Sequence, residues 1–261
     1  MIQNEVYLEP IQHKYFYRST GKELTSVSKV LDSLKEKVDW EKIAGNVAGK
    51  GKFSHLPTKQ DVLDFWKANA KEATDFGTDQ HEMQERYAKE FKVLDKDSVW
   101  EKRIKTVSAF FTKYYKSEDE ACVFSRKYNV AGTMDKGLFV KKGSKLFVIA
   151  DYKTALKAGE LDYVNEKDKF LIGPASHLQD CKFSRYCLQL AIYSVLAEEC
   201  AGLIITELFI VFLPSNPDKE PYKIAVPYMR DTAVAILEHF YNSNNITILA
   251  NADLNDVPTF D

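Results

Sequence analysis

The chain has 261 residues, of which 45% are hydrophobic and 13% aromatic, a composition that supplies a sizeable core and excludes bulk disorder. Its 36 Lys and Arg residues are balanced by 38 Asp and Glu residues, which excludes the globally basic surface of a histone-like DNA binder. Any nucleic-acid site must therefore be a local basic patch, and the length favours one compact domain.

The sequence contains no segment typical of a membrane span or of a secreted protein. The longest apolar run, Leu203 to Leu213, has about half of the ~20 residues required and is interrupted by Glu207. The N-terminus lacks a basic region followed by an apolar run, and four cysteines without a Cys-x-x-Cys pair favour free, buried thiols. We therefore expect a cytoplasmic protein, of a bacterium or of a phage-infected host cell, with no membrane partner.

The first 118 residues are predicted to form a mainly helical lobe. The stretch 15–17 and a glycine turn at Gly21 indicate one strand, after which Thr25 or Ser26 can cap a helix. Apolar residues then recur at helical spacing in four segments, which are 27–34, a stretch from about 61, 77–91 and 100–116.

Beyond Glu120 the spacing becomes that of strands. Strands are predicted over five segments, which are 122–128, 130–140, 146–151, 203–213 and 222–226. A helix capped by Ser184 and ended near Gly202 precedes the fourth of them, and a last helix begins at Asp231. This order predicts an α/β fold with a mixed central sheet flanked by helices. We expect a single domain with a helical lobe (1–118), a sheet core (119–250) and a polar tail (251–261).

Segment 100–116 has two interpretations. It carries an apolar stripe together with five basic residues, Lys102, Arg103, Lys105, Lys113 and Lys116. This pattern is typical of an amphipathic helix with a solvated lysine face. The alternation of basic and aromatic residues also fits a wall of a nucleic-acid groove. The sequence leaves both interpretations open.

Asp135 and Asp151 are predicted to face each other across a hairpin. They are sixteen residues apart, and their midpoint is Gly143 in the predicted turn 141–144. Residues equidistant from the turn of an antiparallel pair lie opposite each other, with Cβ atoms ~5 Å apart. Two carboxylates this close repel unless a cation lies between them, and carboxylate oxygens suit Mg²⁺ or Mn²⁺.

Lys153 is predicted to join this carboxylate pair. It lies two residues beyond Asp151, so the two-residue period of a strand places both side chains on one face. Two aspartates and a lysine together can bind a metal, hold a phosphate against it and orient hydroxide, as phosphodiester hydrolysis requires. A simpler interpretation is an exposed hairpin with an Asp–Lys ion pair.

Two predicted helices carry further candidates for the same site. His81 lies in the first turn of the helix that Gly77 opens, with Glu85 one turn later on the same face. A neutral imidazole is a good metal ligand, although His81 can equally be a surface histidine. Gln189 and Tyr193 are four residues apart on a helix that is otherwise apolar nearly all round. A buried glutamine there needs hydrogen-bond partners.

Taken together, these motifs resemble those of the PD-(D/E)XK nuclease superfamily, in its RecB-like exonuclease branch. Four pieces carry the resemblance in their usual order, Gly77-Thr78-x-x-His81, Val130-Ala131-Gly132-Thr133-Met134-Asp135, Ile149-Ala150-Asp151-Tyr152-Lys153-Thr154 and Gln189-x-x-x-Tyr193. They span residues 77–193, and the helix start Thr25-Ser26-Val27-Ser28 is similar to the entry segment of this branch. The resemblance implies a restriction-endonuclease-like core.

The resemblance also implies a metal centre. Asp135 and Asp151 would be metal-binding carboxylates, and Lys153 would be the catalytic lysine. His81 and the Tyr152 carbonyl would be further ligands of the Mg²⁺ or Mn²⁺ ion.

Two helical residues complete the catalytic set that the resemblance implies. Gln189 and Tyr193 would position Lys153 or the DNA. Glu85 and Glu120 match family positions less securely. Several relatives in this branch carry a four-cysteine iron-sulfur cluster, but the cysteine spacing of this chain does not fit one, so none is expected.

The resulting expectation is a metal-dependent DNA exonuclease that hydrolyses phosphodiester bonds from the ends of single-stranded DNA or of a duplex, in replication, recombination or repair. Stand-alone exonucleases of phages and of mitochondrial genome maintenance are similar. An endonuclease of the same fold and a catalytically silent nucleic-acid-binding protein are the alternatives. The oligomeric state is left open.

Overall fold

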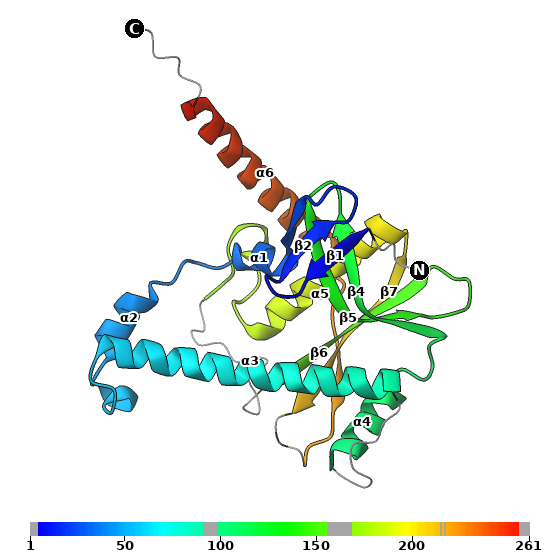
Figure 1. The fold of residues 1–261 in the computed structure, drawn as a ribbon, viewed down its shortest axis with the longest axis horizontal. Helices are drawn as coiled ribbons and strands as arrows, with labels where there is room; N and C mark the ends of the chain where they lie inside the picture. Colours follow the sequence, from blue (N-terminus) through cyan, green and yellow to red (C-terminus); the bar gives the residue numbers. More distant parts are fainter. Residues whose placement is uncertain (1–4, 91–98, 156–168, 215, 217, 256–261) are drawn as a thin grey trace.

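The computed structural model describes residues 5–90, 99–155, 169–214, 216 and 218–255 (Figure 1). Its strands are β1 (Val6–Glu9), β2 (Lys14–Tyr17), β3 (Glu23–Ser26), β4 (Lys116–Ser125), β5 (Val130–Phe139), β6 (Leu146–Ala155), β7 (Ile204–Pro214) and β8 (Tyr222–Ala225). Its helices are α1 (Val27–Asp32), α2 (Trp40–Val47), α3 (Lys59–Glu90), α4 (Val99–Ala109), α5 (Lys182–Ala201) and α6 (Arg230–Asn255), with short 3-10 turns η1 (Gly51–Phe53) and η2 (Gly173–Ala175).

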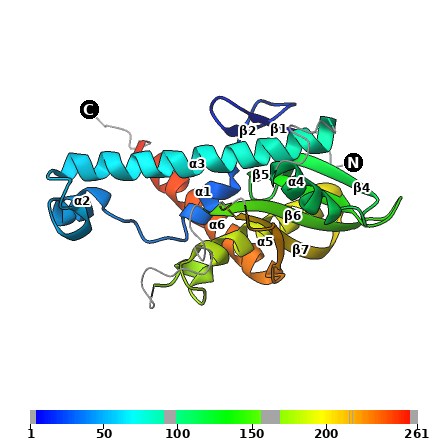
Figure 2. The same cartoon turned by 90° about the horizontal axis from the view of Figure 1, so that it is seen from below.

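A mixed sheet forms the centre of the molecule. Its strand order is β1-β2-β3-β5-β6-β7-β8, and β4 is also paired with β5. The pairs β3–β5 and β6–β7 are parallel, whereas the other neighbours are antiparallel. Helices α3 and α4 lie on one face of the sheet, and α5 and α6 lie on the other (Figure 2). The predicted α/β fold with a mixed central sheet flanked by helices is thus confirmed.

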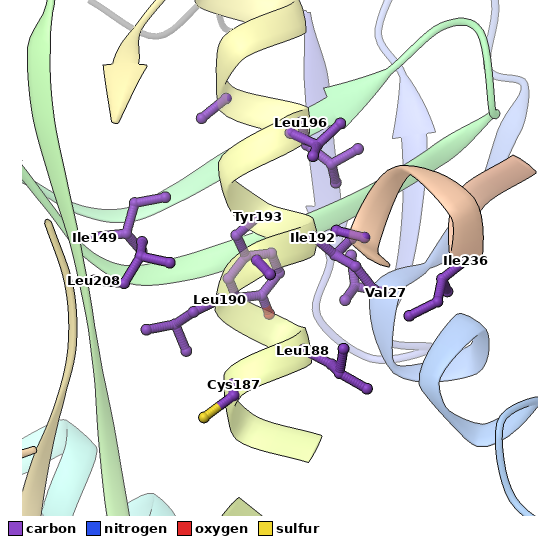
Figure 3. Close-up of a cluster of buried hydrophobic side chains, with 14 of the residues drawn as sticks. Val27, Ile149, Cys187, Leu188, Leu190, Ile192, Tyr193, Leu196, Leu208 and Ile236 are labelled. Atoms are coloured by element: carbon purple, nitrogen blue, oxygen red, sulfur yellow. The ribbon is translucent and has the colours of Figure 1, made fainter. Parts of the chain in front are cut away.

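The largest hydrophobic core lies between the sheet and α5. This helix is apolar nearly all round, as its sequence indicates, and it is therefore buried on most of its surface. Figure 3 shows Leu190 and Tyr193 of α5 beside Ile149 of β6, with Val27 of α1 and Ile236 of α6 completing the cluster. The helix that carries two candidate site residues is thus fixed rigidly against the sheet.

The N-terminal region contributes three strands, of which the sequence predicted only one. β3 runs parallel to β5, with Thr25 opposite Val130 and Ser26 opposite Ala131. Ser26 then caps α1 as predicted, because its Oγ accepts a hydrogen bond from the Lys29 amide at 3.2 Å. Each of these strands has four residues, which is too short for a two-residue period to be recognised.

The predicted helix start at Gly77 is wrong, because α3 runs without interruption from Lys59 to Glu90. Glycine in a helix costs about 1 kcal/mol relative to alanine but keeps its N–H donor, so the helix continues through it. A Cβ atom placed on Gly77 would lie 3.5 Å from Thr154 Oγ1, so α3 passes close beside β6 here. His81 therefore lies in the interior of a long helix and not in a first turn.

The caps of α5 differ from the prediction at one end. Cys181 and not Ser184 is the N-cap, since the Cys181 Sγ accepts from the Ser184 amide at 3.4 Å. Gly202, with φ +59°, ends the helix as predicted. All four cysteines are free thiols, as expected, although two of them are only half-buried.

Two other helix ends also differ from the prediction. α4 ends at Ala109, and 110–114 form turns that place Phe111 against the sheet before β4 begins. α6 extends to Asn255, so the first part of the predicted tail is helical, and 256–261 lie outside the described residues. Within the described parts of the chain, none of the helices has the length and apolar character that crossing a membrane requires.

Candidate active site

The register of the β5–β6 hairpin places Asp135 opposite Asp151. The paired residues run from Phe139 and Phe147 to Lys136 and Ala150, so the hairpin is centred on residue 143. Gly143 lies in the turn with φ +71°, a backbone conformation that favours glycine. Asp135 and Asp151 are the next pair after the last one in the ladder. The predicted hairpin register is therefore confirmed, and it brings Asp135 and Asp151 to the same end of the ladder.

The two strands diverge at this point. Asp135 Oδ2 accepts a hydrogen bond of 2.8 Å from the backbone amide of Tyr152, so a side-chain oxygen replaces the main-chain acceptor of the regular ladder. β6 continues alongside β7 as far as Ala155. The carboxylates thus lie at a fork in the sheet, where the backbone of β5 no longer covers β6.

The side chains of β5 change their alternation between the two faces of the sheet near the fork. A Cβ atom on Gly132 would lie 2.5 Å from the Tyr193 ring, and one on Gly137 would lie 2.4 Å from the Phe147 ring. Both rings belong to the core under α5, so both glycines face that side of the sheet. Residues five apart on a regular strand face opposite sides, so the pleat of β5 shifts by one residue between the two glycines.

The shift coincides with Glu120 and Asp135. The β4–β5 register omits this pair, and Glu120 has φ +50°, as in strand irregularities that re-aim a side chain. After the shift, Asp135 lies on the α5 side of the sheet, which Asp151 also faces. Glu120 itself is exposed, and its less secure match to a family position stays a prediction.

Asp151 and Lys153 form a buried ion pair. The carboxylate of Asp151 has 2% of its surface exposed, and the Lys153 side chain, whose ammonium contacts Asp151 Oδ2, has 14%. The ammonium also lies 4.8 Å from the centre of the Tyr186 ring. The ion pair of the simpler interpretation is thus present, but it is enclosed by α5 and not displayed on an exposed hairpin.

The charges of the site influence one another. Burial raises the pKa of Asp135, and the Lys153 ammonium and the Tyr152 amide offset part of this effect. Burial acts to lower the pKa of Lys153, but the carboxylates of Asp151 and Asp135 outweigh it, so this pKa is raised above its ordinary value. Lys153 is therefore protonated at neutral pH and acts as a fixed positive charge beside two acidic groups.

Gln189 and Tyr193 lie next to each other on α5. Gln189 is half-buried and not fully buried as the apolar pattern of the helix suggested, and its amide nitrogen donates a hydrogen bond of 2.9 Å to the Tyr193 hydroxyl. Burial, with a contribution from the negative charge of Asp151, raises the pKa of Tyr193 well above its ordinary value. The close contact of its ring with Gly132 fixes Tyr193 against β5, three residues before Asp135.

Tyr186, on the same otherwise apolar helix, lies beside the ion pair, and the apolar pattern of the helix did not indicate it as a candidate. It lies three residues before Gln189, a spacing that places two residues on the same helix face. This spacing was the available signal. An aromatic residue on an apolar helix, however, more often belongs to the core.

His81 and Glu85 are placed only in part. Their backbone belongs to α3, but their side chains lie outside the described residues. The role of His81 as a metal ligand and that of the Tyr152 carbonyl stay predictions. In the described part of the chain, no group of three or more His, Cys, Asp or Glu side chains is arranged to hold a metal ion.

The basic residues of segment 100–116 are engaged with other groups. Four lysines form ion pairs, Lys102 with Glu220, Lys105 with Glu101, Lys113 with Glu207 and Lys116 with Glu118. Arg103 is buried and donates to the Pro214 carbonyl at the end of β7 and to the Asn216 and Lys219 carbonyls of the β7–β8 connection. These contacts favour the amphipathic helix over a wall of a nucleic-acid groove.

Comparison with known proteins gives likenesses of fold only. No protein-family model and no curated protein matches the chain. It is similar to the solved structure of a "Putative exonuclease" from Eubacterium rectale, with 15% identity over 88% of this chain and 82% of that chain and a TM-score of 0.40. It is also similar to SSO0001, with 18% identity over 62% of this chain and 72% of that chain and a TM-score of 0.30. At these TM-scores neither likeness bears on function.

Proposed function

We propose that the protein is a metal-dependent nuclease that hydrolyses DNA phosphodiester bonds, acting from strand ends as an exonuclease. The observation that supports this most directly is the gathering of Asp135, Asp151 and Lys153 at the fork of β5 and β6. A structural ion pair needs only one carboxylate, and a second one beside it is unfavourable without a further positive charge. The arrangement is therefore better explained by a group that binds there.

The residues fit a divalent cation of the Mg²⁺ type. Mg²⁺ in proteins is ordinarily bound through one or two carboxylates and keeps water molecules and substrate phosphate oxygens as its other ligands. Asp135 and Asp151 would hold it, with the Tyr152 carbonyl and His81 as further predicted ligands. A bound Mg²⁺ or Mn²⁺ lowers the pKa of a water molecule and neutralises charge on the reacting phosphate.

The side chains around this position have separate roles. Lys153 has three donors and no lone pair while it is protonated, so it contacts the phosphate and the attacking water and does not bind the metal. Asp151 and the Tyr186 ring hold the ammonium from two sides. Gln189 and Tyr193 fix the wall of α5 behind it, and this wall excludes water and strengthens each electrostatic interaction.

Cleavage from the ends of DNA strands distinguishes the proposed exonuclease from an endonuclease and from a silent nucleic-acid-binding protein. An endonuclease would use the same three charged residues, and a silent nucleic-acid-binding protein would have no physical reason to keep them. The proposed setting is DNA replication, recombination or repair, in a bacterium or in a phage-infected cell.

The test is cleavage of end-labelled linear DNA and of circular single-stranded DNA with Mn²⁺, with Mg²⁺ or with EDTA. We expect linear DNA to be degraded only with a divalent cation and circular DNA to stay intact. Asp151→Asn should lower the rate by several orders of magnitude with the fold retained, because it removes a charge and keeps the shape.

Asp119→Asn is the matched control. Asp119 of β4 is half-buried and forms an ion pair of 2.8 Å with the buried Lys136 of β5, whose ammonium faces the Phe111 ring on the opposite side of the sheet. This variant should lose thermal stability but keep its cleavage. Cleaved circles would show an endonuclease, and DNA binding without any divalent-dependent cleavage would contradict nuclease activity.

A further inference from the structure

A cavity of about 360 Å³ lies far from the fork, at the end of the sheet where the β5–β6 turn, the start of β4 and the α5–β7 connection meet. We call it the tip cavity. Its lining includes Tyr115, Lys116, Phe139, Lys141 and Lys145, and none of the described residues that line it is acidic. Its volume is within the range of roughly 300–1,000 Å³ that ligand sites occupy.

The tip cavity carries positive charge that the protein itself does not neutralise. Lys141 and Lys145 line the cavity, and Lys142 lies between them in the same turn; all three are exposed, and no acidic side chain among the described residues forms an ion pair with them. Lys116 is paired with Glu118 at 2.8 Å. The lysines of segment 100–116 are all paired in this way, whereas the lysines of this turn form a local basic patch.

The lysines are held by an ordered turn beside an aromatic ring. The Ser144 amide donates to the Lys141 carbonyl at 3.2 Å, and the Ser144 hydroxyl accepts from the Leu146 amide at 2.9 Å. The Tyr115 amide donates to the Phe139 carbonyl at 2.9 Å, which anchors Tyr115 at the cavity with 55% of its surface exposed. A ring of this exposure offers a stacking surface next to fixed positive charges.

We propose that the tip cavity binds the phosphates of a nucleic-acid strand, with one base stacked on Tyr115. The class of ligand rests on the proposed function, whereas its charge and its aromatic component follow from the lining residues. Lysines without acidic partners attract polyanions and release counterions when they neutralise phosphates. The tip cavity is therefore an anchoring site for substrate and takes no part in the cleavage step.

The distance between the tip cavity and the fork sets a minimum length for a nucleic-acid strand that reaches both. Gly143 is eight residues from Asp135 and eight from Asp151, so the turn lies about 27 Å from the carboxylates at ~3.3–3.4 Å per strand residue. In a stacked strand this distance corresponds to about eight phosphates at 3.4 Å each. A trinucleotide at the fork cannot reach the tip cavity, whereas a strand of twenty nucleotides can.

The experiment compares two triple variants that remove the same charge. One combines Lys141→Gln, Lys142→Gln and Lys145→Gln. The control combines Lys22→Gln, Lys37→Gln and Lys219→Gln, which are exposed lysines on other surfaces. Binding of a labelled single strand of twenty nucleotides is measured by anisotropy in EDTA at several salt concentrations. Adenosine monophosphate serves as a competing probe, and trinucleotide cleavage is measured with Mn²⁺.

We expect the tip variant to bind the strand at least tenfold more weakly than wild type, and the control at most about twofold more weakly. The salt slope, which is the slope of the logarithm of the binding constant against the logarithm of the salt concentration, should be smaller in magnitude by about 2 for the tip variant. Each lost phosphate contact to a single strand contributes ~0.7. Trinucleotide cleavage should be unchanged. Tyr115→Ala should weaken binding by about tenfold, with little change in salt slope.

Equal weakening in both triple variants, or an unchanged salt slope, would overturn the proposal. Adenosine monophosphate that displaces the strand and binds wild type but not the tip variant would show a free-nucleotide site and would overturn it as well. A wild-type protein that cleaves nothing, but whose strand binding depends on the three tip lysines, would refute the proposed nuclease activity and support the tip cavity.

Discussion

Two lysines on one hairpin show how position decides what a buried charge can do. Lys136 and Lys153 are each paired with an aspartate and each placed near an aromatic ring, but they lie on opposite faces of the sheet. Lys136 has a single carboxylate partner, Asp119, so the two charges of this pair balance each other. Lys153 lies beside two carboxyl groups, so when both are ionised one negative charge is left on this face of the hairpin for a cation to compensate.

This difference leads to a prediction for Lys153→Ala. The chemical step should slow by about 10²-fold or more, the usual effect of losing a positioned electrostatic group. Divalent-cation affinity should be equal or slightly higher, because a positive charge near the cation is removed. Single-turnover rates at saturating Mn²⁺ and DNA measure the first effect, and calorimetry with Mn²⁺ measures the second.

Lys136→Ala is the control for this prediction. It breaks a buried pair of the same kind, so it should lower the free energy of unfolding, by about 3–5 kcal/mol, without slowing the chemical step. A Lys153→Ala protein that cleaves at the wild-type rate under saturating conditions would reduce Lys153 to an ion-pair partner of Asp151.

The sequence was sufficient to predict the pairing of Asp135 with Asp151, because an antiparallel register follows from the position of the turn at Gly143. It was not sufficient for Tyr186, whose contact with Lys153 depends on how α5 lies across the sheet. Periodicity identifies which face of a helix is apolar, but it does not say which polar group of another element that face meets.

At the scale of elements, α5 connects the core to the site. Its apolar surface fixes it against the sheet, and Gly132 lets the ring of Tyr193 approach β5 more closely than any side chain would allow. The helix itself was predictable from its long apolar pattern. The continuity of α3 through Gly77 and the short strands β1 and β3 were not, because pairing and packing with distant segments decided them.

A prediction for α5 is that Gln189→Ala slows cleavage about ten- to a hundredfold, while the melting temperature falls only slightly. The reason is that the amide fixes Tyr193 behind Lys153, and loss of such supporting hydrogen bonds typically has effects of this size. Paired melting curves and single-turnover rates measure the two effects.

Tyr193→Phe tests the same hydrogen bond from its other end. It keeps the ring against Gly132 and removes only the hydroxyl, so the double variant with Gln189→Ala should be no slower than the slower single variant. Near-normal activity in a strongly destabilised Gln189→Ala protein would mean that the bond serves the core alone.

At the scale of the whole molecule, a buried tyrosine links the N-terminal strands to the central strand β5. Tyr15 of β2 is 5% exposed, and its hydroxyl lies 3.1 Å from Thr133 Oγ1 on β5. Burial raises the pKa of Tyr15, and the hydrogen bond to Thr133 offsets this only in part. The folded protein therefore retains a proton that the unfolded chain loses near the ordinary tyrosine pKa of about 10.

The consequence is an alkaline loss of stability to which Tyr15 contributes. Below the pKa of Tyr15 in the unfolded chain, both states bind the proton, so the contribution of Tyr15 to stability is complete. This contribution is lost as the pH rises above about 10, toward the raised pKa of Tyr15 in the folded protein. Tyr15→Phe should lower the free energy of unfolding by about 1 kcal/mol at pH 8, through the lost hydrogen bond. The difference from wild type should shrink above pH 10.

Urea unfolding at a series of pH values from 8 to 11 measures this difference. Tyr115→Phe is the matched control, because that side chain is 55% exposed, and its curve should run parallel to that of wild type. A difference between Tyr15→Phe and wild type that stays constant across the series would contradict the assignment.

The parallel pairing of β3 with β5 also bears on the order in which the chain assembles. Ser26 pairs with Ala131, more than a hundred residues away, whereas the β5–β6 hairpin closes around the adjacent turn. Local closure is fast and distant closure is slow, so we expect the hairpin that carries the two aspartates to form before β3 pairs with β5. β1 to β3 are synthesised before β5, so β3 has no parallel partner until β5 is available. Strands of four residues offer only a short unpaired edge for aggregation during that interval.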